Sequence, residues 1–123
     1  MKYRATKIFT FDAAHFLEGY DGKCSNIHGH TYKLEVTIEK AQLNDQGFVC
    51  DFNRIKEIVE EKVIKKYDHQ LINDVMSVRP TAEKMAEMIF YELEFAFLNE
   101  SAALVKIRLY ETPTSYVEVI ADE

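Results

Sequence analysis

The chain has 123 residues, of which 47% are hydrophobic and 29% charged, the balance of one globular domain with a buried core. Its net charge of −6 argues against a nucleic-acid partner, because affinity for nucleic acid comes mainly from Lys and Arg side chains that neutralise phosphates. The opening MKYRATKIFTF carries no secretory signal and no stretch is long enough to cross a bilayer, so we expect one cytoplasmic domain over residues 1–123, with both cysteines reduced and no membrane partner.

Two strands are expected near the N-terminus. Residues 3–15 place apolar side chains at alternate positions, with Lys7 as an interruption. Residues 28–40 alternate apolar and polar side chains more regularly, as a strand with one buried face does. The NDQG segment at 44–47 is typical of a turn and ends this first part of the chain.

Two helices are expected in the middle of the chain. Residues 53–67 repeat apolar side chains at helical spacing, and Asp51 or Asn53 can cap the start of that helix. Residues 67–75 are predicted to be a connection. A second helix begins after Thr81, a suitable N-cap residue, and buries a stripe that includes methionines as core-filling side chains.

Two more strands, residues 103–111 and 115–121, are joined by a short turn. The order is then β-β-α-α-β-β, which indicates an α+β domain with a four-stranded antiparallel sheet and both helices on one face. The edge strands of such a sheet invite pairing with another chain. We therefore expect a homo-oligomer.

Half of the histidines lie in the segment CSNIHGH (24–30). Side chains two residues apart on a strand share a face, so His28 and His30 aim together. His15 ends the preceding strand, and an antiparallel hairpin places it beside them. Three neutral imidazoles with one open position are typical of catalytic zinc sites. The alternative is three histidines that hydrogen-bond to other partners without a metal.

Cys24 lies in the loop at the same end of this hairpin, and two interpretations of it remain open. It could be a fourth ligand that closes the site and makes the metal structural. It could instead stay off the metal as a reactive thiol, because a nearby cation or imidazolium lowers a thiol pKa and supplies a thiolate base or nucleophile.

Two other positions carry candidate chemistry. Asp68 precedes His69 in the connection, where a carboxylate can fix the tautomer of an imidazole and raise its basicity; the alternative is a pair of exposed loop side chains. Glu111 shares the apolar face of its strand, and a buried carboxylate needs partners such as the two-donor edge of a guanidinium or an amino-pyrimidinone. Alternatively, the strand ends earlier and Glu111 is exposed in the turn.

Five segments follow one another along the chain: FDAAHFL (11–17), CSNIHGH (24–30), YDHQLIND (67–74), RPTAE (79–83) and YET (110–112). Together they resemble the 6-pyruvoyl-tetrahydropterin synthase family, and most closely its bacterial branch, the 6-carboxy-tetrahydropterin synthases of queuosine biosynthesis. The spacing C-x3-H-G-H is that of the carboxy branch, whereas the animal pyruvoyl enzymes have a longer gap. The resemblance extends over nearly the whole chain.

This resemblance implies the T-fold, whose ββααββ order is the one expected above. It also implies that subunits form trimeric β-barrels, and that two trimers stack face to face into a homohexamer. The sites of such an assembly lie at subunit interfaces. Asp68 and His69 would then serve the Cys24 of a neighbouring subunit.

The resemblance further implies a zinc cofactor held by His15, His28 and His30, and 7,8-dihydroneopterin triphosphate as the substrate. The zinc would acidify a C–H bond of the substrate side chain. The products would be 6-carboxy-tetrahydropterin, acetaldehyde and triphosphate. Two alternatives are a 6-pyruvoyl-tetrahydropterin product and a non-catalytic zinc-binding module with Cys24 as the fourth ligand.

The remaining roles are implied in the same way. Cys24 would be the general base, and Asp68 with His69 would relay the proton. The substrate-binding residues would be Glu111, which accepts two hydrogen bonds from the pyrimidine edge of the pterin, with Thr81 and Glu83 in support.

Overall fold

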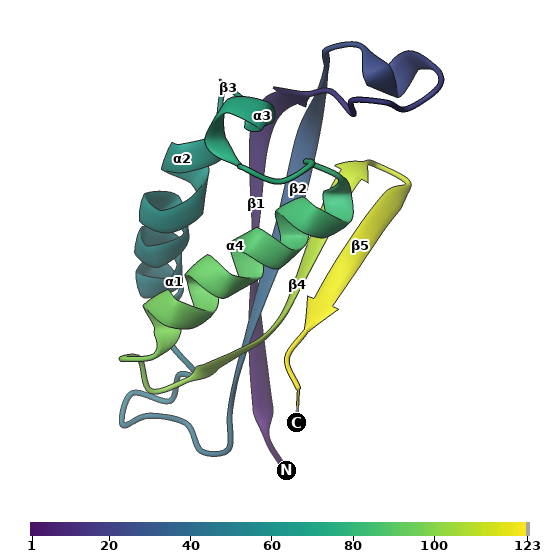
Figure 1. Cartoon of the computed structure of the whole chain (residues 1–123). Helices are drawn as coiled ribbons and strands as arrows, with labels where there is room; N and C mark the ends of the chain where they lie inside the picture. Colours follow the sequence, from purple (N-terminus) through teal and green to yellow (C-terminus); the bar gives the residue numbers. More distant parts are fainter. Residues whose placement is uncertain (123) are drawn as a thin grey trace.

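The computed structural model describes residues 1–122 of the chain (Figure 1). Its elements, in chain order, are β1 (Tyr3–His15), the 3₁₀ helix η1 (Lys23–Ser25), β2 (His28–Lys40), α1 (Phe52–Val59), the π-helix η2 (Glu60–Ile64), α2 (Lys65–Tyr67), β3 (Gln70–Leu71), α3 (Ile72–Val75), α4 (Ala82–Phe97), β4 (Ala103–Thr112) and β5 (Ser115–Ile120). The expected order of two strands, a helical region and two strands is confirmed.

The sheet has five strands in the order β3-β1-β2-β4-β5. Its four long strands are antiparallel neighbours, as expected, but β3 adds a short parallel pairing with Ala13 and Ala14 of β1. The expectation of four strands was therefore one short, and residues 67–75 hold β3 and α3 rather than only a connection. A strand of two residues is too short to show an alternating pattern.

Both long helical segments lie on one face of the sheet (Figure 1). The first runs continuously through α1, η2 and α2, and it begins where the side chain of Asp51 accepts a hydrogen bond from the backbone of Asn53. Helix α4 begins after Thr81, whose side chain accepts a hydrogen bond from the backbone of Lys84. Each helix thus starts at a side-chain cap that satisfies a backbone donor.

The core lies between these helices and the inner face of the sheet. Its largest fully buried side chains are Tyr32, Tyr67, Phe11, Leu34, Ile38, Ile55, Ile72, Met85, Ile89, Leu93, Ile107 and Leu109. The apolar positions of β2 and β4 face inward because side chains alternate along a strand. Met88, one of the methionines of α4 expected in the core, is only half-buried at its margin.

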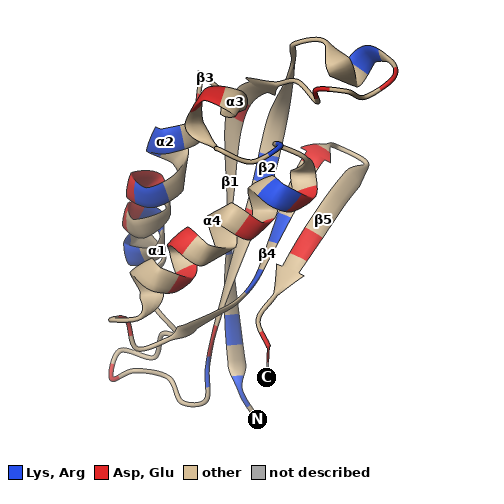
Figure 2. Cartoon of the chain, in the orientation of Figure 1, with Lys and Arg blue, Asp and Glu red and all other residues tan. Residues whose placement is uncertain are grey.

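The opposite face of the sheet is polar. Figure 2 shows charged bands along the strands and on the helices. Arg4 pairs with Glu39 at 2.7 Å, Arg108 pairs with Glu118 at 3.0 Å, and the Lys33 ammonium lies 4.0 Å from the ring centre of Tyr110. In residues 1–122, no helix has both the length and the apolar character needed to cross a membrane.

One end of the sheet opens beyond its last cross-strand pair. The pairing of β2 with β4 stops at Lys33 and Tyr110, although β2 continues to His28 and β4 to Thr112. At the same end β1 and β2 stay paired as far as His15 and His28. The fold therefore brings histidines of the hairpin and the end of β4 to one place.

Candidate metal centre

Three histidine rings meet at this open end of the sheet. His15 and His28 are opposite each other in the β1–β2 ladder, and His30 lies two residues further along the same face. Their ring centres are 4.6 Å apart for His15 and His28, 5.1 Å for His15 and His30, and 4.9 Å for His28 and His30. The hairpin register thus produces the convergence that the spacing predicts.

Main-chain carbonyl groups fix two of the rings. The Nδ1 atom of His15 lies 2.8 Å from the carbonyl oxygen of Pro80, and the Nδ1 atom of His28 lies 2.7 Å from that of Asn26. A carbonyl oxygen only accepts, so we assign the proton of each ring to Nδ1. The Nε2 atoms then present lone pairs, which is the form of histidine that binds a metal.

Glu111 completes the cluster. Its Oε1 atom lies 3.2 Å from Nε2 of His15 and 3.1 Å from Nε2 of His30. These distances are in ion-pair range, yet neither buried nitrogen has a hydrogen-bond partner of acceptable geometry among the described residues. The ligand atoms of His15, His28, His30 and Glu111 all lie within 4.8 Å of one another. Three imidazole nitrogens and one carboxylate oxygen suit zinc.

The charges of the cluster are coupled. The close contact with the His15 ring holds the pKa of Glu111 below its ordinary value, against the effect of burial, and His30 adds to this. Burial alone lowers the pKa of His15, but the oxygens of Glu111 and Pro80 more than offset it and raise that pKa. Burial lowers the pKa of His30 and so favours its neutral form. The cluster is an ionised carboxylate beside imidazoles.

Cys24 lies outside this group of ligand atoms. It belongs to η1, its thiol is unpaired and half-buried, and its carbonyl oxygen accepts a hydrogen bond from the backbone of Leu17 at 2.7 Å. The ligand atoms of this cluster come from three histidines and Glu111 instead, and a second group, Asp12, Asp68 and His69, also lacks Cys24. The carboxylate, not the sulfur, lies against the imidazole nitrogens.

Asp68 and His69 contact each other although they are adjacent in sequence. His69 has a left-handed backbone with φ of 60°, and its Nδ1 lies 3.0 Å from the carboxylate of Asp68. The other carboxylate oxygen accepts a hydrogen bond from the backbone of Asp12 at 2.9 Å, which, with His69, holds the pKa of Asp68 below its ordinary value. His69 also lines an open hollow of about 540 Å³ together with His30.

Thr81 and Glu83 lie at the start of α4. The Thr81 hydroxyl accepts the hydrogen bond that caps the helix, and Glu83 is an exposed residue of the first turn. Neither belongs to the group of clustered ligand atoms. Their neighbour Pro80, through its carbonyl, is the part of this segment that contacts His15.

A second hollow, of about 590 Å³, borders the cluster. His30 and Glu111 line it on one side, and Lys33, Tyr110 and Thr112 are among the other residues that line it. It occupies the opening where β2 and β4 part. A concave space beside a metal-binding cluster is the usual position of a small-molecule site.

The sequence interpretation missed several groups that orient the site. The carbonyls of Asn26 and Pro80 carry no side-chain signal. Asn73 accepts a hydrogen bond from the backbone of Phe16 and donates one back, both at 3.0 Å, and so holds the residue next to His15. Asn73 belongs to the YDHQLIND segment (67–74), and its side-chain amide was the one feature that could have indicated a role in holding the neighbouring backbone.

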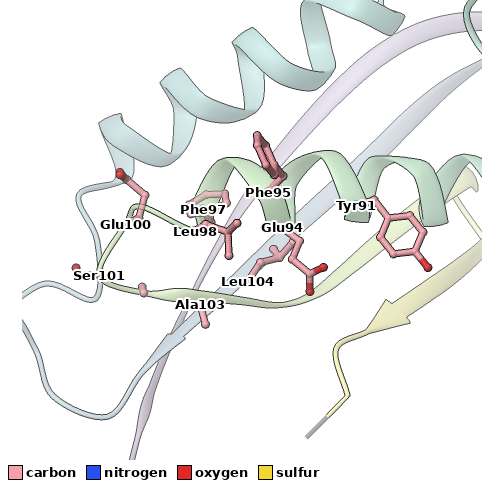
Figure 3. Close-up of a pocket in the computed structure, with 10 residues that line it drawn as sticks. Tyr91, Glu94, Phe95, Phe97, Leu98, Glu100, Ser101, Ala103 and Leu104 are labelled. Carbon is pink, nitrogen blue, oxygen red and sulfur yellow. The ribbon is translucent and has the colours of Figure 1, made fainter.

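A further pocket lies away from the histidines, at the end of α4 (Figure 3). It has a volume of about 570 Å³ and is lined mainly by apolar side chains with Glu94 and Glu100. Tyr91, Phe95 and Leu98 are exposed beside it. Its lining includes neither histidine nor cysteine, so it has no part in the candidate centre.

The fold and the cluster together define an α+β protein with a candidate metal centre, built from histidines of the β1–β2 hairpin and a carboxylate of β4. The family model described as 6-pyruvoyl tetrahydropterin synthase matches residues 4–122. The chain belongs to the 6-pyruvoyl tetrahydropterin synthase family.

Named relatives agree with this membership. A Haemophilus influenzae protein named 6-carboxy-5,6,7,8-tetrahydropterin synthase is 37% identical over 141 aligned positions, which cover 94% of this chain and 97% of that protein. A Bacillus subtilis protein of the same name is 32% identical, with 93% of this chain and 82% of that protein covered. The structure of Caenorhabditis elegans 6-pyruvoyl tetrahydropterin synthase superposes with a TM-score of 0.88 at 25% identity, covering 99% of this chain and 97% of that one. These likenesses support an enzyme.

Proposed function

We propose that this chain is a zinc-dependent 6-carboxy-tetrahydropterin synthase of queuosine biosynthesis. It would convert 7,8-dihydroneopterin triphosphate to 6-carboxy-5,6,7,8-tetrahydropterin, acetaldehyde and triphosphate. The observation that carries the proposal is the cluster of three imidazoles whose Nε2 lone pairs converge beside a concave space. The names of the bacterial relatives and the C-x3-H-G-H spacing favour the carboxy product.

In this proposal His15, His28 and His30 hold the zinc, because the buried Nε2 atoms of His15 and His30 have no hydrogen-bond partner among the described residues and the ligand atom of His28 lies within 4.8 Å of theirs. When bound, zinc supplies a Lewis acid that stabilises the negative charge developing as a substrate carbon loses its proton. The residues of the chain carry the proton transfers themselves. Their donor set of neutral imidazoles is the one that zinc prefers in catalytic sites.

Cys24 is the proposed general base, and Asp68 with His69 the proposed relay. The thiol of Cys24 is free and reaches partial exposure, as a reacting group must. The depressed pKa of Asp68 keeps its carboxylate ionised, and one of its oxygens lies 3.0 Å from Nδ1 of His69, where it can orient that ring. A positioned acid or base of this kind contributes roughly 10²–10⁴-fold to a rate.

Glu111, Thr81 and Glu83 are the proposed contacts for the pterin ring. A carboxylate accepts two parallel hydrogen bonds from a two-donor edge, and Glu111 is partly exposed at the hollow that borders the cluster. Thr81 keeps a hydroxyl proton to donate after it has accepted its capping hydrogen bond.

We also propose that the protein acts in the cytoplasm as a homohexamer of two trimers. The two unpaired cysteines suit a reducing compartment. The sheet leaves much of β1 and the outer side of β5 unpaired within residues 1–122, so neighbouring copies can continue the ladder. A neighbouring subunit would then bring Asp68 and His69 to Cys24.

The test is turnover by purified, zinc-loaded protein given 7,8-dihydroneopterin triphosphate. We expect acetaldehyde and the carboxylated pterin, identified by mass. A second candidate, the 6-pyruvoyl product, is favoured by the likeness to the C. elegans structure, and the product mass decides between the two. Absence of any turnover contradicts both.

A Cys24→Ala variant separates the enzyme from a non-catalytic zinc module. We expect it to retain zinc and its melting temperature while it loses turnover. Loss of both zinc and stability would instead assign the sulfur to the metal, as in a closed structural site.

A further inference from the structure

We propose that Glu111 is the fourth ligand of the metal in the substrate-free protein. Binding of the pterin ring must displace Glu111 from the metal before the substrate side chain can coordinate there. This inference rests on the proposed function and adds to it a second state of the same site. It concerns one carboxylate and the three histidines beside it.

The distances in the cluster are close to those of a metal tetrahedron. Ligand atoms at the corners of a tetrahedral zinc site are roughly 3.3–3.6 Å apart, given metal–ligand distances of about 2.0–2.2 Å. Oε1 of Glu111 lies 3.2 Å from Nε2 of His15 and 3.1 Å from Nε2 of His30. The carboxylate oxygen therefore stands at the corner that the three histidines leave free.

The tautomer of His15 points the same way. Its Nδ1–H donates a hydrogen bond to the Pro80 carbonyl, so its Nε2 presents a lone pair to the Glu111 oxygen. Two lone pairs at 3.2 Å repel unless a cation lies between them. A hydrogen bond does not resolve this contact, since the buried Nε2 atoms of His15 and His30 have no partner of acceptable geometry in the described residues. A shared metal ion does.

A backbone irregularity aims Glu111 at the cluster. In the β4–β5 ladder Tyr110 pairs with Tyr116 and Thr112 pairs with Ser115, so Glu111 is the extra residue of a bulge. A β-bulge redirects a side chain and is frequent next to functional sites. The pairing of β2 with β4 has already stopped at Tyr110, which leaves the carboxylate free to reach the rings.

The two roles of Glu111 compete for the same carboxylate oxygen. The two-donor edge of a pterin needs both carboxylate oxygens, whereas the cluster engages one of them. The Glu111 side chain is 28% exposed at the hollow, so an arriving ring can reach it. Binding of the ring at Glu111 therefore opens the fourth position on the metal for the side chain of the substrate.

The first experiment measures zinc affinity by competition with a chelator for the wild-type protein, Glu111→Gln, and the control Glu87→Gln. Glu87 is a carboxylate on α4 that pairs with Lys84 and belongs to neither the cluster nor the hollow beside it, so its variant makes the same chemical change away from the site. We expect the dissociation constant for zinc to rise at least about ten-fold in Glu111→Gln, as for other losses around a metal. The control stays at the wild-type value.

The visible spectrum of the Co²⁺-loaded proteins supplies a readout that does not depend on activity. We expect a different ligand-field spectrum for Glu111→Gln and an unchanged one for Glu87→Gln. Thermal unfolding of the metal-free variants shows that each one folds. A folded Glu111→Gln protein with wild-type zinc affinity and an unchanged Co²⁺ spectrum overturns the inference.

The exchange is tested with pterin itself, which has the two-donor edge but no side chain to bind a metal. At saturation, judged by pterin fluorescence, it should alter the Co²⁺ spectrum of the wild-type protein and leave that of Glu111→Gln unaffected. An unaltered wild-type spectrum overturns the exchange. Failure to turn over the triphosphate substrate, with the ligand effects present, removes the proposed function and leaves the ligand role of Glu111 intact.

Discussion

At the scale of single residues, the imidazole of His15 is oriented by the protein itself. Its Nδ1 donates to the Pro80 carbonyl at 2.8 Å, and Asn73 holds the adjoining Phe16 through two hydrogen bonds of 3.0 Å. Contacts of this kind fix the tautomer and the ring plane, and their loss typically costs 10–100-fold in metal affinity. The direction of the His15 donor atom is therefore set by hydrogen bonds of the protein itself.

Histidines inside and outside the metal cluster should respond differently to substitution. We expect His30→Ala to lose bound zinc, because its Nε2 is one of the clustered ligand atoms. We expect His69→Ala to retain zinc and to lose turnover by roughly 10²–10⁴-fold, because it contacts Asp68 instead of the cluster. Elemental analysis of the purified proteins and a turnover assay make the comparison, and zinc loss from His69→Ala would contradict it.

At the scale of elements, the sequence predicts what a repeated pattern specifies. The bounds expected for the first two strands, 3–15 and 28–40, are those of β1 and β2, because a half-buried strand repeats every two residues. The meeting of the histidines follows from that register. By contrast, β3 and α3 are too short for an apolar pattern to repeat along them, so no periodicity reveals them.

Backbone features set the limit of prediction at the site. Every residue has a backbone carbonyl, so no residue type marks Asn26 and Pro80 as the two whose carbonyls fix histidines. The bulge at Glu111 depends on how β4 and β5 pair, which an alternating pattern leaves open. For this reason the contact of Glu111 with the rings was not expected, although its position on the inner face was considered.

Helix α4 offers a test of the core. Leu93 is fully buried, whereas Phe95, two residues further on, is 76% exposed. We expect Leu93→Ala to lower the free energy of unfolding by about 2–5 kcal/mol, since it removes buried methyl groups and leaves a cavity. Phe95→Ala should change it by less than about 0.5 kcal/mol. Urea denaturation followed by circular dichroism measures both, and equal effects would contradict the packing of α4.

At the scale of the whole molecule, the sheet has two open sides. β3 covers β1 only at Ala13 and Ala14, and no described strand pairs with the outer side of β5. The backbone N–H of Ala121 donates inward to Val105, so that of Ile120 points outward, because donors alternate along an antiparallel strand. The edge is thus free to extend the sheet into another copy.

We expect Ile120→Pro to shift the protein to smaller species, because proline removes the outward donor. Ile120→Ala keeps the donor and serves as the control. Light scattering coupled to size-exclusion chromatography measures the mass of each. A wild-type protein that elutes as a monomer would contradict the assembly, and so would a proline variant that keeps the wild-type mass.

Removal of zinc should lower the stability of the whole chain. A ligand that binds only the folded state contributes about 2.7 kcal/mol when its free concentration is 100 times its dissociation constant. We therefore expect the melting temperature to fall with a chelator and to rise again with the logarithm of added zinc. Melting curves of His30→Ala, which lacks a ligand atom, should not respond to zinc, and a response would place the binding elsewhere.

The cluster is assembled from segments that lie far apart in sequence. His15 comes from the first strand, its carbonyl partner Pro80 from the loop before α4, and Glu111 from the end of β4. A nascent chain that has not yet released β4 from the ribosome holds the histidine hairpin but not the carboxylate. Under the proposed four-ligand centre, full zinc affinity requires the finished sheet, so zinc would stabilise completed molecules in preference to incomplete ones.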